Sequence, residues 1–327
     1  MEVVADLAAL DRKLAECDAA LRVSDDALRR VFGTFRMGVP AGAPEDPFGA
    51  EYRAFQMGVY ERVAGKPYTL ANEAVGFSVA EMVRRPFPYS TGSLATTGNQ
   101  LTAIGFLLRQ MELAPGARVL EFGPGWGNTT LALALLGMRV TAVDIEANFC
   151  ALLRGRAAQS GVALEVVQGD FFWAETVREP FDAVLFFECF HHCDDHLRLL
   201  RALHGAVRPG GSVYFACEPV EAGFAVPWGV RMDGESLWAI RNFGWLELGF
   251  EEGYFRAALA RAGWAATRHA SADLPWATVW RAQRLEEAAA PAEDRAAALG
   301  RELAAVYASR SWRVTRPLRA IGRLVGR

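Results

Sequence analysis

The sequence predicts an α/β fold built on a doubly wound sheet, and two observations lead to this prediction. First, between residues 118 and 218 short apolar runs alternate with segments of helical periodicity. This alternation is typical of parallel βαβ units joined by right-handed crossovers. Second, glycines occupy every second position at residues 123, 125 and 127, directly after the first apolar run. In open α/β sheets, ligands bind at such carboxyl ends of strands.

Seven runs have the composition of strands, so we expect a seven-stranded sheet. Their residues are 118–123, 139–144, 164–170, 181–188, 212–218, 264–271 and 276–283. Segments with helical periodicity lie between them, at residues 129–137, 147–161, 196–207 and 251–263. The last two strand-like runs are close in sequence, so we expect them to pair as a hairpin that closes one edge of the sheet.

The segments outside this alternation suggest further divisions of the chain. We expect an N-terminal helix (1–36), a substrate cap segment (37–100), a central α/β domain (101–283) with an aromatic insertion (219–250), and a C-terminal helix with a basic tail (284–327). Between Leu7 and Val31 apolar residues recur at spacings of three and four, which predicts a helix with an apolar seam. Such a seam can join two copies of the chain as a homodimer or pack on its own domain, and the pattern fits both.

Composition excludes some classes of protein. The net charge is −3 and the pI about 6.0, so the chain has no overall basic footprint for nucleic acid. The N-terminus lacks the basic flank and apolar run of a signal peptide, and no later stretch is long and apolar enough to cross a bilayer. The five cysteines show no paired spacing, and we expect them to be reduced. These features predict a cytoplasmic protein.

The glycine-rich stretch EFGPGWG indicates the kind of ligand. Glu121 ends the first strand, and Gly123, Gly125 and Gly127 follow it. A dinucleotide fingerprint needs its third glycine three residues after the second, and Asn128 stands there instead. A carboxylate at this place is unfavourable for a pyrophosphate and favourable for a cationic group. The pattern E-x-G-x-G-x-G resembles the first motif of class I S-adenosylmethionine-dependent methyltransferases, whose sheet is Rossmann-like.

The resemblance extends over about residues 116–218 and implies further cofactor contacts. Asp144 ends the second strand, where the family places an acid on the two ribose hydroxyls. Asp170 and Phe171 follow the third strand, where the family places an acid at the adenine amine and a backbone N–H on the ring. Glu188 ends the fourth strand and is expected to line the cofactor pocket. The resemblance therefore implies S-adenosyl-L-methionine as the cofactor and methyl transfer as the activity.

The stretch FFECFHHCDDH follows the fourth strand, which in this family ends beside the transferred methyl group. His191 and His192 are the candidate general bases, because a histidine with a pKa near 6.5 accepts a hydroxyl proton at neutral pH. They can instead serve only to cap and pack the following helix. A further alternative makes His192, Asp195 and His196 metal ligands, since residues i and i+4 share a helix face. The sequence shows no compact additional ligand, and we predict no metal.

The acceptor contacts are expected in the insertion, which together with the cap segment would close over the cofactor. Candidates are aromatic side chains that can stack on a sugar ring and arginines that can hold an anion. They are Trp228, Arg231, Trp238 and Arg241, with Phe243 and Trp245 beside them. The same aromatic side chains can instead form a small core that holds the insertion together.

The C-terminal tail suggests a location. Residues 310–327 hold six arginines and no acid, interleaved with apolar residues. This pattern predicts a basic amphipathic segment on an anionic membrane surface, here the inner membrane, although a tail in solvent or bound to a protein gives the same pattern. The stretch also resembles C-terminal segments of bacterial glycosyltransferases and methyltransferases of surface-polysaccharide assembly.

These observations together lead us to expect an O-methyltransferase that acts on a sugar hydroxyl, in polysaccharide or nucleotide-sugar metabolism. A second hypothesis keeps the cofactor and changes the acceptor to a phenolic or polyketide-like small molecule, which an apolar acceptor pocket would favour. A third is a non-catalytic scaffold in a glycan-assembly complex. The intact cofactor positions argue against the scaffold, because a scaffold does not need them.

Overall fold

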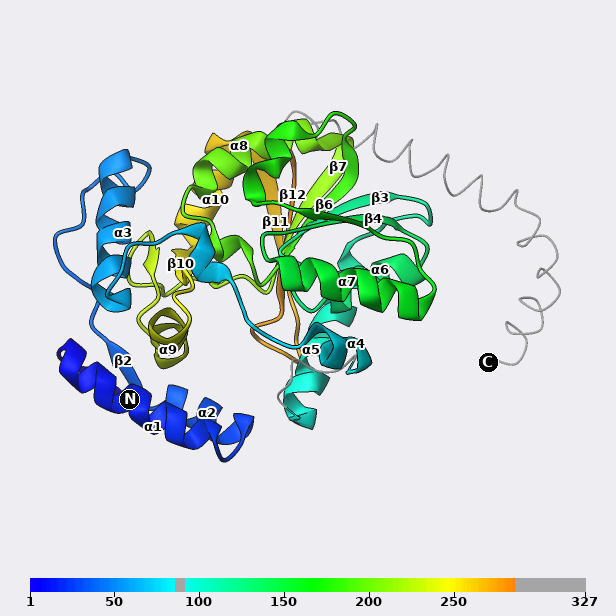
Figure 1. Cartoon of the computed structure of the whole chain (residues 1–327). Helices are drawn as coiled ribbons and strands as arrows, with labels where there is room; N and C mark the ends of the chain where they lie inside the picture. The colour runs from blue at the N-terminus through cyan, green and yellow to red at the C-terminus, as the bar shows by residue number, and fades with distance from the viewer. Residues whose placement is uncertain (86–91, 286–327) are drawn as a thin grey trace, which may run out of the picture. The chain divides into compact units, whose positions relative to one another are not determined.

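The computed structural model describes residues 1–85 and 92–285, and its centre is a seven-stranded sheet (Figure 1). The strand order is β11-β12-β7-β6-β3-β4-β5, with β3 to β7 parallel and β11 and β12 antiparallel. The strands are β3 (Arg118–Phe122), β4 (Arg139–Asp144), β5 (Glu165–Gln168), β6 (Phe181–Phe187), β7 (Val207–Ala216), β11 (Trp264–Ala270) and β12 (Thr278–Arg284). All seven expected strands are confirmed, including the closing hairpin.

One strand begins earlier than expected. The fifth strand was expected to begin at residue 212, but the preceding sequence RPGG, residues 208–211, already lies inside β7. The register between β6 and β7 shifts there, between the pairs Phe181↔Val207 and Ala183↔Ser212. The residues of β7 between Val207 and Ser212 form a bulge, so they do not take part in the regular hydrogen bonding with β6.

Helices cover both faces of the sheet, as expected for a doubly wound fold. Side chains alternate along β3, so Leu120 and Phe122 share a core with α8 and α10, whereas Val119 shares a second core with α5 and α6. The helices that accompany the sheet are α4 (Val79–Arg84), α5 (Leu94–Gln110), α6 (Asn128–Leu135), α7 (Ala147–Ser160), α8 (His196–Ala206) and α10 (Glu252–Arg261). Glu121 alternates with Leu120 and Phe122 and therefore faces the side of α5 and α6.

The N-terminal segment contains two helices, so the expectation of a single helix from Leu7 to Val31 is wrong. Helix α1 (Leu7–Leu21) ends before Ser24, whose side chain caps α2 (Asp25–Phe32) by accepting the N–H of Ala27 at 3.1 Å. Serine competes with helix propagation in this way because its hydroxyl satisfies the free N–H groups of a new first turn. Two short strands, β1 (Glu2–Val4) and β2 (Phe35–Met37), flank the pair in parallel.

The apolar seam of these helices is already covered by the same chain. Leu10, Leu14, Cys17 and Leu28 are buried in the core of the single chain. Leu7 and Leu21, at the ends of α1, are exposed, and the possible homodimer through residues 7–31 stays a prediction. Self-packing, the alternative that the pattern left open, is what the structure shows.

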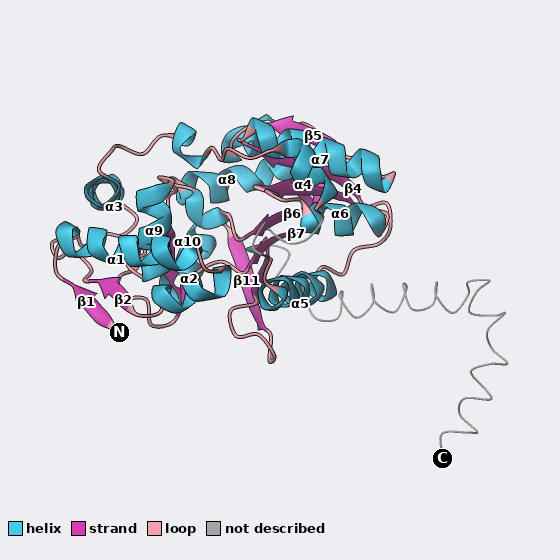
Figure 2. Cartoon of the chain, turned by 60° about the horizontal axis from the view of Figure 1, so that its bottom comes forward, coloured by secondary structure: helices cyan, strands magenta, loops and turns pink. Residues whose placement is uncertain are grey.

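The aromatic insertion folds into a small sheet of its own. Its three strands, in the order β8-β10-β9, are β8 (Val220–Glu221), β10 (Leu248–Glu251) and β9 (Trp228–Val230), and helix α9 (Gly234–Asn242) precedes β10. The cap helix α3 (Ala50–Ala64) packs against it, and Tyr52 donates a hydrogen bond to the carbonyl of Trp228 at 2.9 Å. Figures 1 and 2 show α9 beside α1, α2 and β2, away from α6 and α7.

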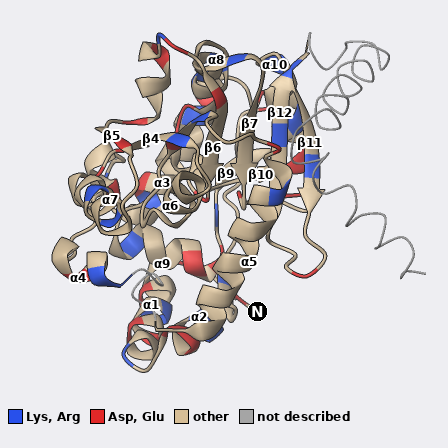
Figure 3. Cartoon of the chain, turned by 90° about the vertical axis from the view of Figure 1, so that its right-hand side faces the viewer, with Lys and Arg blue, Asp and Glu red and all other residues tan. Residues whose placement is uncertain are grey.

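Residues Met1–Arg284 form one compact unit, and the domain boundaries proposed within it remain predictions. Acidic and basic residues are interspersed over its elements (Figure 3). In the part of the chain that the structure describes, no helix has the length and apolar character needed to span a membrane. The expected C-terminal helix and the basic tail, residues 310–327, lie outside the described residues.

Candidate active site

The turn between β3 and α6 is built from glycines because its backbone is left-handed at three positions. The φ angles of Gly123, Gly125 and Gly127 are 56°, 49° and 75°. Side chains at two of these positions would also collide with their neighbours. A Cβ on Gly123 would lie 2.8 Å from Cβ of Cys189, and one on Gly127 would lie 2.2 Å from Cδ2 of Leu153. The sequence pattern therefore reflects backbone conformation and close packing together.

Gly125 differs from its neighbours because it borders open space. A Cβ there would meet no atom within 4 Å. Its N–H donates to Oδ2 of Asp144 at 3.1 Å, which ties the turn to the end of β4. The other oxygen of Asp144 accepts the N–H of Glu146 at 2.9 Å. Burial raises the pKa of Asp144 to about 6, although these two N–H groups act to lower it.

Two adjoining cavities open at this turn. The larger, of about 200 Å³, runs along the ends of β3, β4 and β6, and the smaller, of about 140 Å³, lies over the glycine turn. Both are lined by Gly123, Gly125 and Glu188. Of the sequence-predicted cofactor residues, the larger cavity also contains Asp144, Asp170 and Phe171, and the smaller contains Glu121 and Gly127. All eight predicted cofactor residues therefore line one cavity or both.

Asp170 and Phe171 lie at the start of a short 3-10 helix (Phe171–Thr176) after β5. One oxygen of Asp170 accepts the N–H of Phe172 at 2.8 Å and so caps this helix. The ring of Phe171 packs against Phe122 and Phe186, with centroids 5.9 Å apart in both pairs. The cavity here has an apolar wall with one carboxylate at its edge.

Glu121 is a buried carboxylate with no hydrogen-bond partner among the described residues. It is 0 % exposed, and neither oxygen accepts a hydrogen bond. Burial raises its pKa to about 7, although the neighbouring Thr130 and Thr129 hydroxyls act to lower it. An ionised carboxylate without a partner is costly in this environment, so the site favours a ligand that brings a cation or several N–H donors.

Glu188 separates the two cavities and adopts a strained backbone conformation. Its φ angle is 51°, which is uncommon for a residue with a Cβ. Gln100 of α5 donates a hydrogen bond to its Oε2 at 3.0 Å, and burial raises its pKa. Helix α5 thereby contacts the wall between the two cavities.

The two candidate bases have different environments, and that of His191 is the less favourable for a base. His191 is buried, with Nδ1 2.8 Å from Oε2 of Glu218 and Nε2 3.5 Å from Oε2 of Glu247. Burial acts to lower its pKa, but Glu218 and then Glu247 outweigh that effect and raise the pKa to about 10. The two carboxylates therefore favour the protonated form of His191, which is the form that cannot act as a base. His191 is also absent from the lining of both cavities.

His192 does line the larger cavity, beside residues from the cap and the insertion. Its Nδ1 lies 3.6 Å from Oε2 of Glu73 and has no hydrogen-bond partner within the described residues. Tyr68, from the cap, and Trp245, from the insertion, complete this end of the cavity. Burial raises the pKa of Glu73, whereas the nearby His192 acts to lower it. We call this end, formed by Tyr68, Glu73, His192 and Trp245, the acceptor end.

The metal set suggested by the sequence is not assembled. His196 is buried in the core with Nε2 2.7 Å from the hydroxyl of Tyr254, and Asp195 caps α8 and pairs with Arg53. A different set has ligand atoms within 4.8 Å of one another, namely His191, His192 and Glu247. Arg231 already contacts Glu247 at 3.5 Å. Two cations, His191 and Arg231, therefore already pair with Glu247, and a metal ion bound by this set would have to displace a proton of His191 and the contact with Arg231.

Three of the four predicted acceptor contacts attach the insertion to the cap segment and to helix α1. Their polar groups are engaged by other segments, and none lines either cavity. Trp228 donates from Nε1 to the carbonyl of Pro47 at 2.7 Å, Trp238 donates to Asp18 at 3.0 Å, and Arg241 pairs with Asp11. Arg231, the fourth, lies behind the acceptor end in the ion pairs of Glu247 and Asp233.

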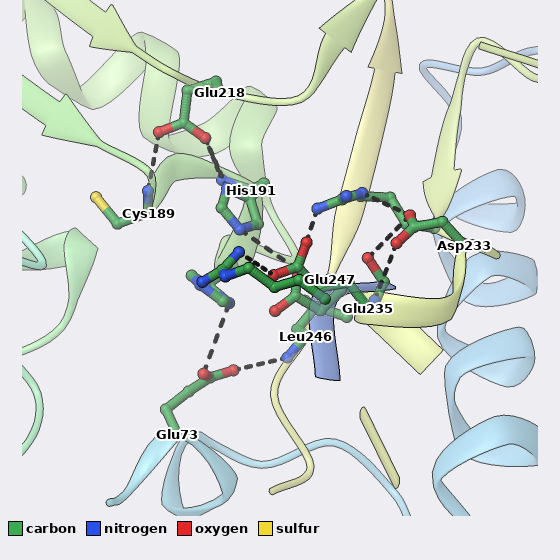
Figure 4. A network of polar contacts seen from close by, with 12 residues as sticks. Glu73, Cys189, His191, Glu218, Asp233, Glu235, Leu246 and Glu247 are labelled. Atoms are coloured by element: carbon green, nitrogen blue, oxygen red, sulfur yellow. Dashed lines mark hydrogen bonds and ion pairs between the residues drawn. The ribbon is translucent and has the colours of Figure 1, made fainter. Parts of the chain in front are cut away.

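Sequence reasoning did not identify Glu73, Glu218 or Glu247 as parts of the site. Glu218 ends the fifth predicted strand, so an acid at a strand end was a signal that could have indicated it. The segments around Glu73 and Glu247 carry no motif, and only the folded chain brings them to the two histidines (Figure 4).

Comparison with known proteins identifies the central part of the chain. Residues 120–215 match a family model described as a methyltransferase domain. A ubiquinone biosynthesis O-methyltransferase from Xanthomonas campestris pv. campestris (strain B100) is 35% identical over 103 residues, which is 31% of this chain and 43% of the relative. One from Pseudomonas syringae pv. tomato is 36% identical over 104 residues, which is 31% of this chain and 44% of the relative. The match spans less than half the length of these curated relatives.

Solved structures show a more distant likeness. The mitomycin 7-O-methyltransferase has 20% sequence identity and a TM-score of 0.46, covering 84% of this chain and 75% of that chain. A magnesium protoporphyrin IX methyltransferase from Synechocystis PCC 6803 with bound SAH has 16% identity and a TM-score of 0.46, covering 63% of this chain and 93% of that chain. Similarity at this level carries no argument about the acceptor.

Proposed function

We propose that this chain, whose residues 120–215 form a class I S-adenosylmethionine-dependent methyltransferase domain, transfers a methyl group to a hydroxyl of an uncharged acceptor. The observation that carries the proposal is the pair of adjoining cavities. One contains a buried carboxylate without a partner, Glu121, and the other ends at a histidine beside a carboxylate, His192 and Glu73. The first suits a cationic cofactor and the second suits proton removal.

The residues present fit S-adenosylmethionine. Glu121, with both oxygens free of hydrogen bonds, would bind the amino group of the methionine moiety. Asp144 would bind the ribose hydroxyls, since each of its oxygens has used one lone pair on a backbone N–H. Asp170 and Phe171 would hold the adenine, and the wall formed by Phe122 and Phe149 excludes water from it. When bound, the cofactor supplies a methyl group on a sulfonium, which is already an excellent leaving group.

The protein therefore has to position a hydroxyl and take its proton. His192 is the residue of the acceptor end that can do so. Because Nδ1 faces Glu73, Nε2 is the nitrogen left to accept the proton as the bond between the acceptor oxygen and the methyl carbon forms. The Glu73 carboxylate, held by the N–H of Leu246 at 3.0 Å, orients the ring and stabilises the imidazolium that results.

The lining argues for an uncharged acceptor. Among the described residues of the larger cavity there is neither lysine nor arginine, whereas four carboxylates lie there. Glu73, Asp144, Asp170 and Glu188 would repel a phosphate. A neutral sugar hydroxyl, as the sequence led us to expect, satisfies this condition, and Trp245 offers a face for a sugar ring. A nucleotide-linked sugar does not satisfy this condition, because it carries phosphate groups.

A second acceptor class has a specific observation in its favour. Tyr68 and Trp245 make the acceptor end largely aromatic, which suits a phenolic small molecule. The assignment to surface polysaccharide and to the inner membrane depends on residues 310–327, which lie outside the described residues. We therefore keep the sugar hydroxyl as the proposed acceptor and the phenol as its competitor.

The test is methyl transfer to separated acceptor pools. The full-length protein is incubated with methyl-labelled S-adenosylmethionine and with fractions of neutral glycans, lipid-linked glycans, nucleotide sugars and phenolic compounds. We expect label in a neutral glycan or phenolic fraction. His192→Gln should slow transfer by about 100-fold or more, since general-base catalysis contributes 10²–10⁴-fold. The affinity of this variant for S-adenosylhomocysteine should stay within about twofold of the unaltered protein, because His192 contacts the acceptor.

His269→Gln, a substitution of the histidine on β11, is the matched control and should be fully active. Label that enters only nucleotide sugars would contradict the uncharged acceptor. An unslowed His192→Gln would contradict the base assignment while leaving the methyltransferase activity standing.

A further inference from the structure

Glu218 holds the backbone turn that carries both histidines. Its Oε1 accepts the N–H groups of Cys189 and Phe190, each at 2.9 Å. Its Oε2 accepts the N–H of His191 at 3.1 Å and contacts Nδ1 of the same residue at 2.8 Å. One buried carboxylate thus binds four N–H groups of three consecutive residues (Figure 4). These charge-assisted bonds fix the conformation of the turn.

His191 continues this contact into the insertion. Its Nε2 lies 3.5 Å from Oε2 of Glu247, directly before β10. Arg231 approaches the same oxygen at 3.5 Å and also pairs with Asp233 at 3.0 Å. The side chain of His191 therefore lies between a carboxylate of the central sheet and one of the insertion, as Figure 4 shows.

The segment that Glu247 ends also forms a wall of the acceptor end. Trp245 lines the larger cavity. The N–H of Leu246 donates to Oε1 of Glu73 at 3.0 Å, and Glu247 binds His191. Trp245 therefore faces the acceptor end, Leu246 is bound to Glu73, and Glu247 is bound to His191.

We propose that His191 is a positioning residue that, held by Glu218, sets His192 and the segment 245–247 at a fixed separation across the acceptor end. The proposal rests on the function proposed above. His191 does not touch the acceptor, because it is buried and lies outside both cavities. It acts through two neighbours: His192, whose ring centroid is 4.2 Å from its own, and Glu247.

A metal ion is the competing explanation for this cluster. His191, His192 and Glu247 have ligand atoms within 4.8 Å of one another. An imidazole that gives its other nitrogen to a carboxylate, as His191 does to Glu218, is common among metal ligands. Against it, Arg231 already contacts the Glu247 oxygen that faces His191, so a metal ion at that oxygen would be repelled by the guanidinium. The test below separates the two explanations.

The experiment compares the full-length protein with His191→Gln and Glu247→Gln, and His269→Gln is the matched control. Hydrogen exchange is followed on peptides that cover residues 243–250, and the ring signals of His192 are followed by ¹⁵N NMR of histidine-labelled protein. We expect both variants to exchange the amide of Leu246 at least about tenfold faster and to shift the His192 signals. The control should change neither. Affinity for S-adenosylhomocysteine should stay within about twofold in all three, since Glu121 and Asp144 are untouched.

Each outcome bears on the proposal in a defined way. Unchanged exchange and unchanged His192 signals in Glu247→Gln, with the protein folded, would overturn it even if His191→Gln does not fold. Stoichiometric binding of zinc chloride by the unaltered protein, lost in both variants, would overturn it in favour of a metal site. Failure of the unaltered protein to bind S-adenosylhomocysteine would count against the proposed function alone, because neither structural readout requires cofactor.

Discussion

The carboxylate of Glu121 predicts that cofactor affinity depends on pH in a defined direction. Burial raises its pKa to about 7, and the amino group proposed to bind it needs the ionised form. At about pH 6 roughly one tenth of the cofactor-free protein has Glu121 ionised, and at about pH 8 roughly nine tenths. Affinity for S-adenosylhomocysteine should therefore rise by about tenfold between these values, which corresponds to about 1.4 kcal/mol.

Glu121 affects the stability of the cofactor-free protein in the opposite direction: stability falls as the pH rises. Between about pH 4.5 and about pH 7 the folded state keeps the Glu121 proton that the unfolded state has lost. The unfolding free energy therefore falls as the pH rises through this window, by about 3 kcal/mol if no other group compensates. Bound cofactor should abolish this loss, because it pairs the ionised carboxylate.

The assay is calorimetric titration of S-adenosylhomocysteine at several pH values, with thermal unfolding measured alongside. Glu121→Gln should bind more weakly at about pH 8 and lose most of the pH dependence, since the amide has no charge to titrate. Glu112→Gln, which changes an exposed carboxylate paired with Arg281, is the control. It should keep both the affinity of the unaltered protein at about pH 8 and its pH dependence. Asp144, whose pKa is about 6, adds a dependence only at the lower end of the range. A Glu121→Gln protein with the full slope of the unaltered protein would refute the reasoning.

Two further predictions concern stability and location. The pKa of His191 is raised from its ordinary 6.5 to about 10, so its charge stabilises the folded protein fully below about pH 6.5, and this stability is lost as the pH rises to about 10. The thermal unfolding temperature should fall over that window, and Glu247→Gln should make the fall smaller. An equal fall in the variant would contradict the ion pair. Truncation after residue 307 should release the protein from anionic phospholipid vesicles and leave cofactor affinity unchanged, because the six arginines are removed while the cavities stay intact; equal vesicle binding by both forms would remove the membrane role.

The cofactor residues could be predicted from the sequence because their roles follow from local order along the chain. Gly123 and Gly127 mark a left-handed turn, and Glu121 and Asp144 each stand at a strand end. Parallel strands bring their carboxyl ends to one edge, so a correct strand assignment already places these residues together. The strands themselves were clear because each is a short apolar run bounded by turn residues.

The roles of His191 and His192 could not be distinguished in this way. They are adjacent in sequence and identical in type, and they differ only in which carboxylates reach them. Glu218, 27 positions later, binds one, and Glu73, from the cap, faces the other. The bound carboxylates raise the pKa of His191 to about 10 and so favour its cationic form, which no local pattern reveals.

Trp228 and Trp238, predicted as acceptor contacts, lie outside both cavities for a related reason. The insertion packs into the main core, because nine of its residues between Val220 and Phe250 belong to the same apolar cluster as Leu120 and Phe122 of β3. Trp228 is 2 % exposed and packs with Tyr52, and Trp238 packs with Phe32. Both side chains therefore pack on the main core of the chain, and Trp245, which the sequence did not single out from its neighbours, is the one that lines the cavity.

The two ends of the site differ in how their buried charges are balanced, and this difference implies an order of binding. Glu121, at the cofactor end, has no cationic partner within the described residues. Behind the acceptor end, His191 and Arg231 already neutralise Glu247, and its pKa falls to about 2 despite burial. Electrostatic free energy is therefore gained mainly when the cofactor binds and brings a cation to Glu121, whereas an uncharged acceptor brings none. This charge distribution favours an order in which the cofactor binds first. The acceptor then binds through aromatic contact and one hydrogen bond.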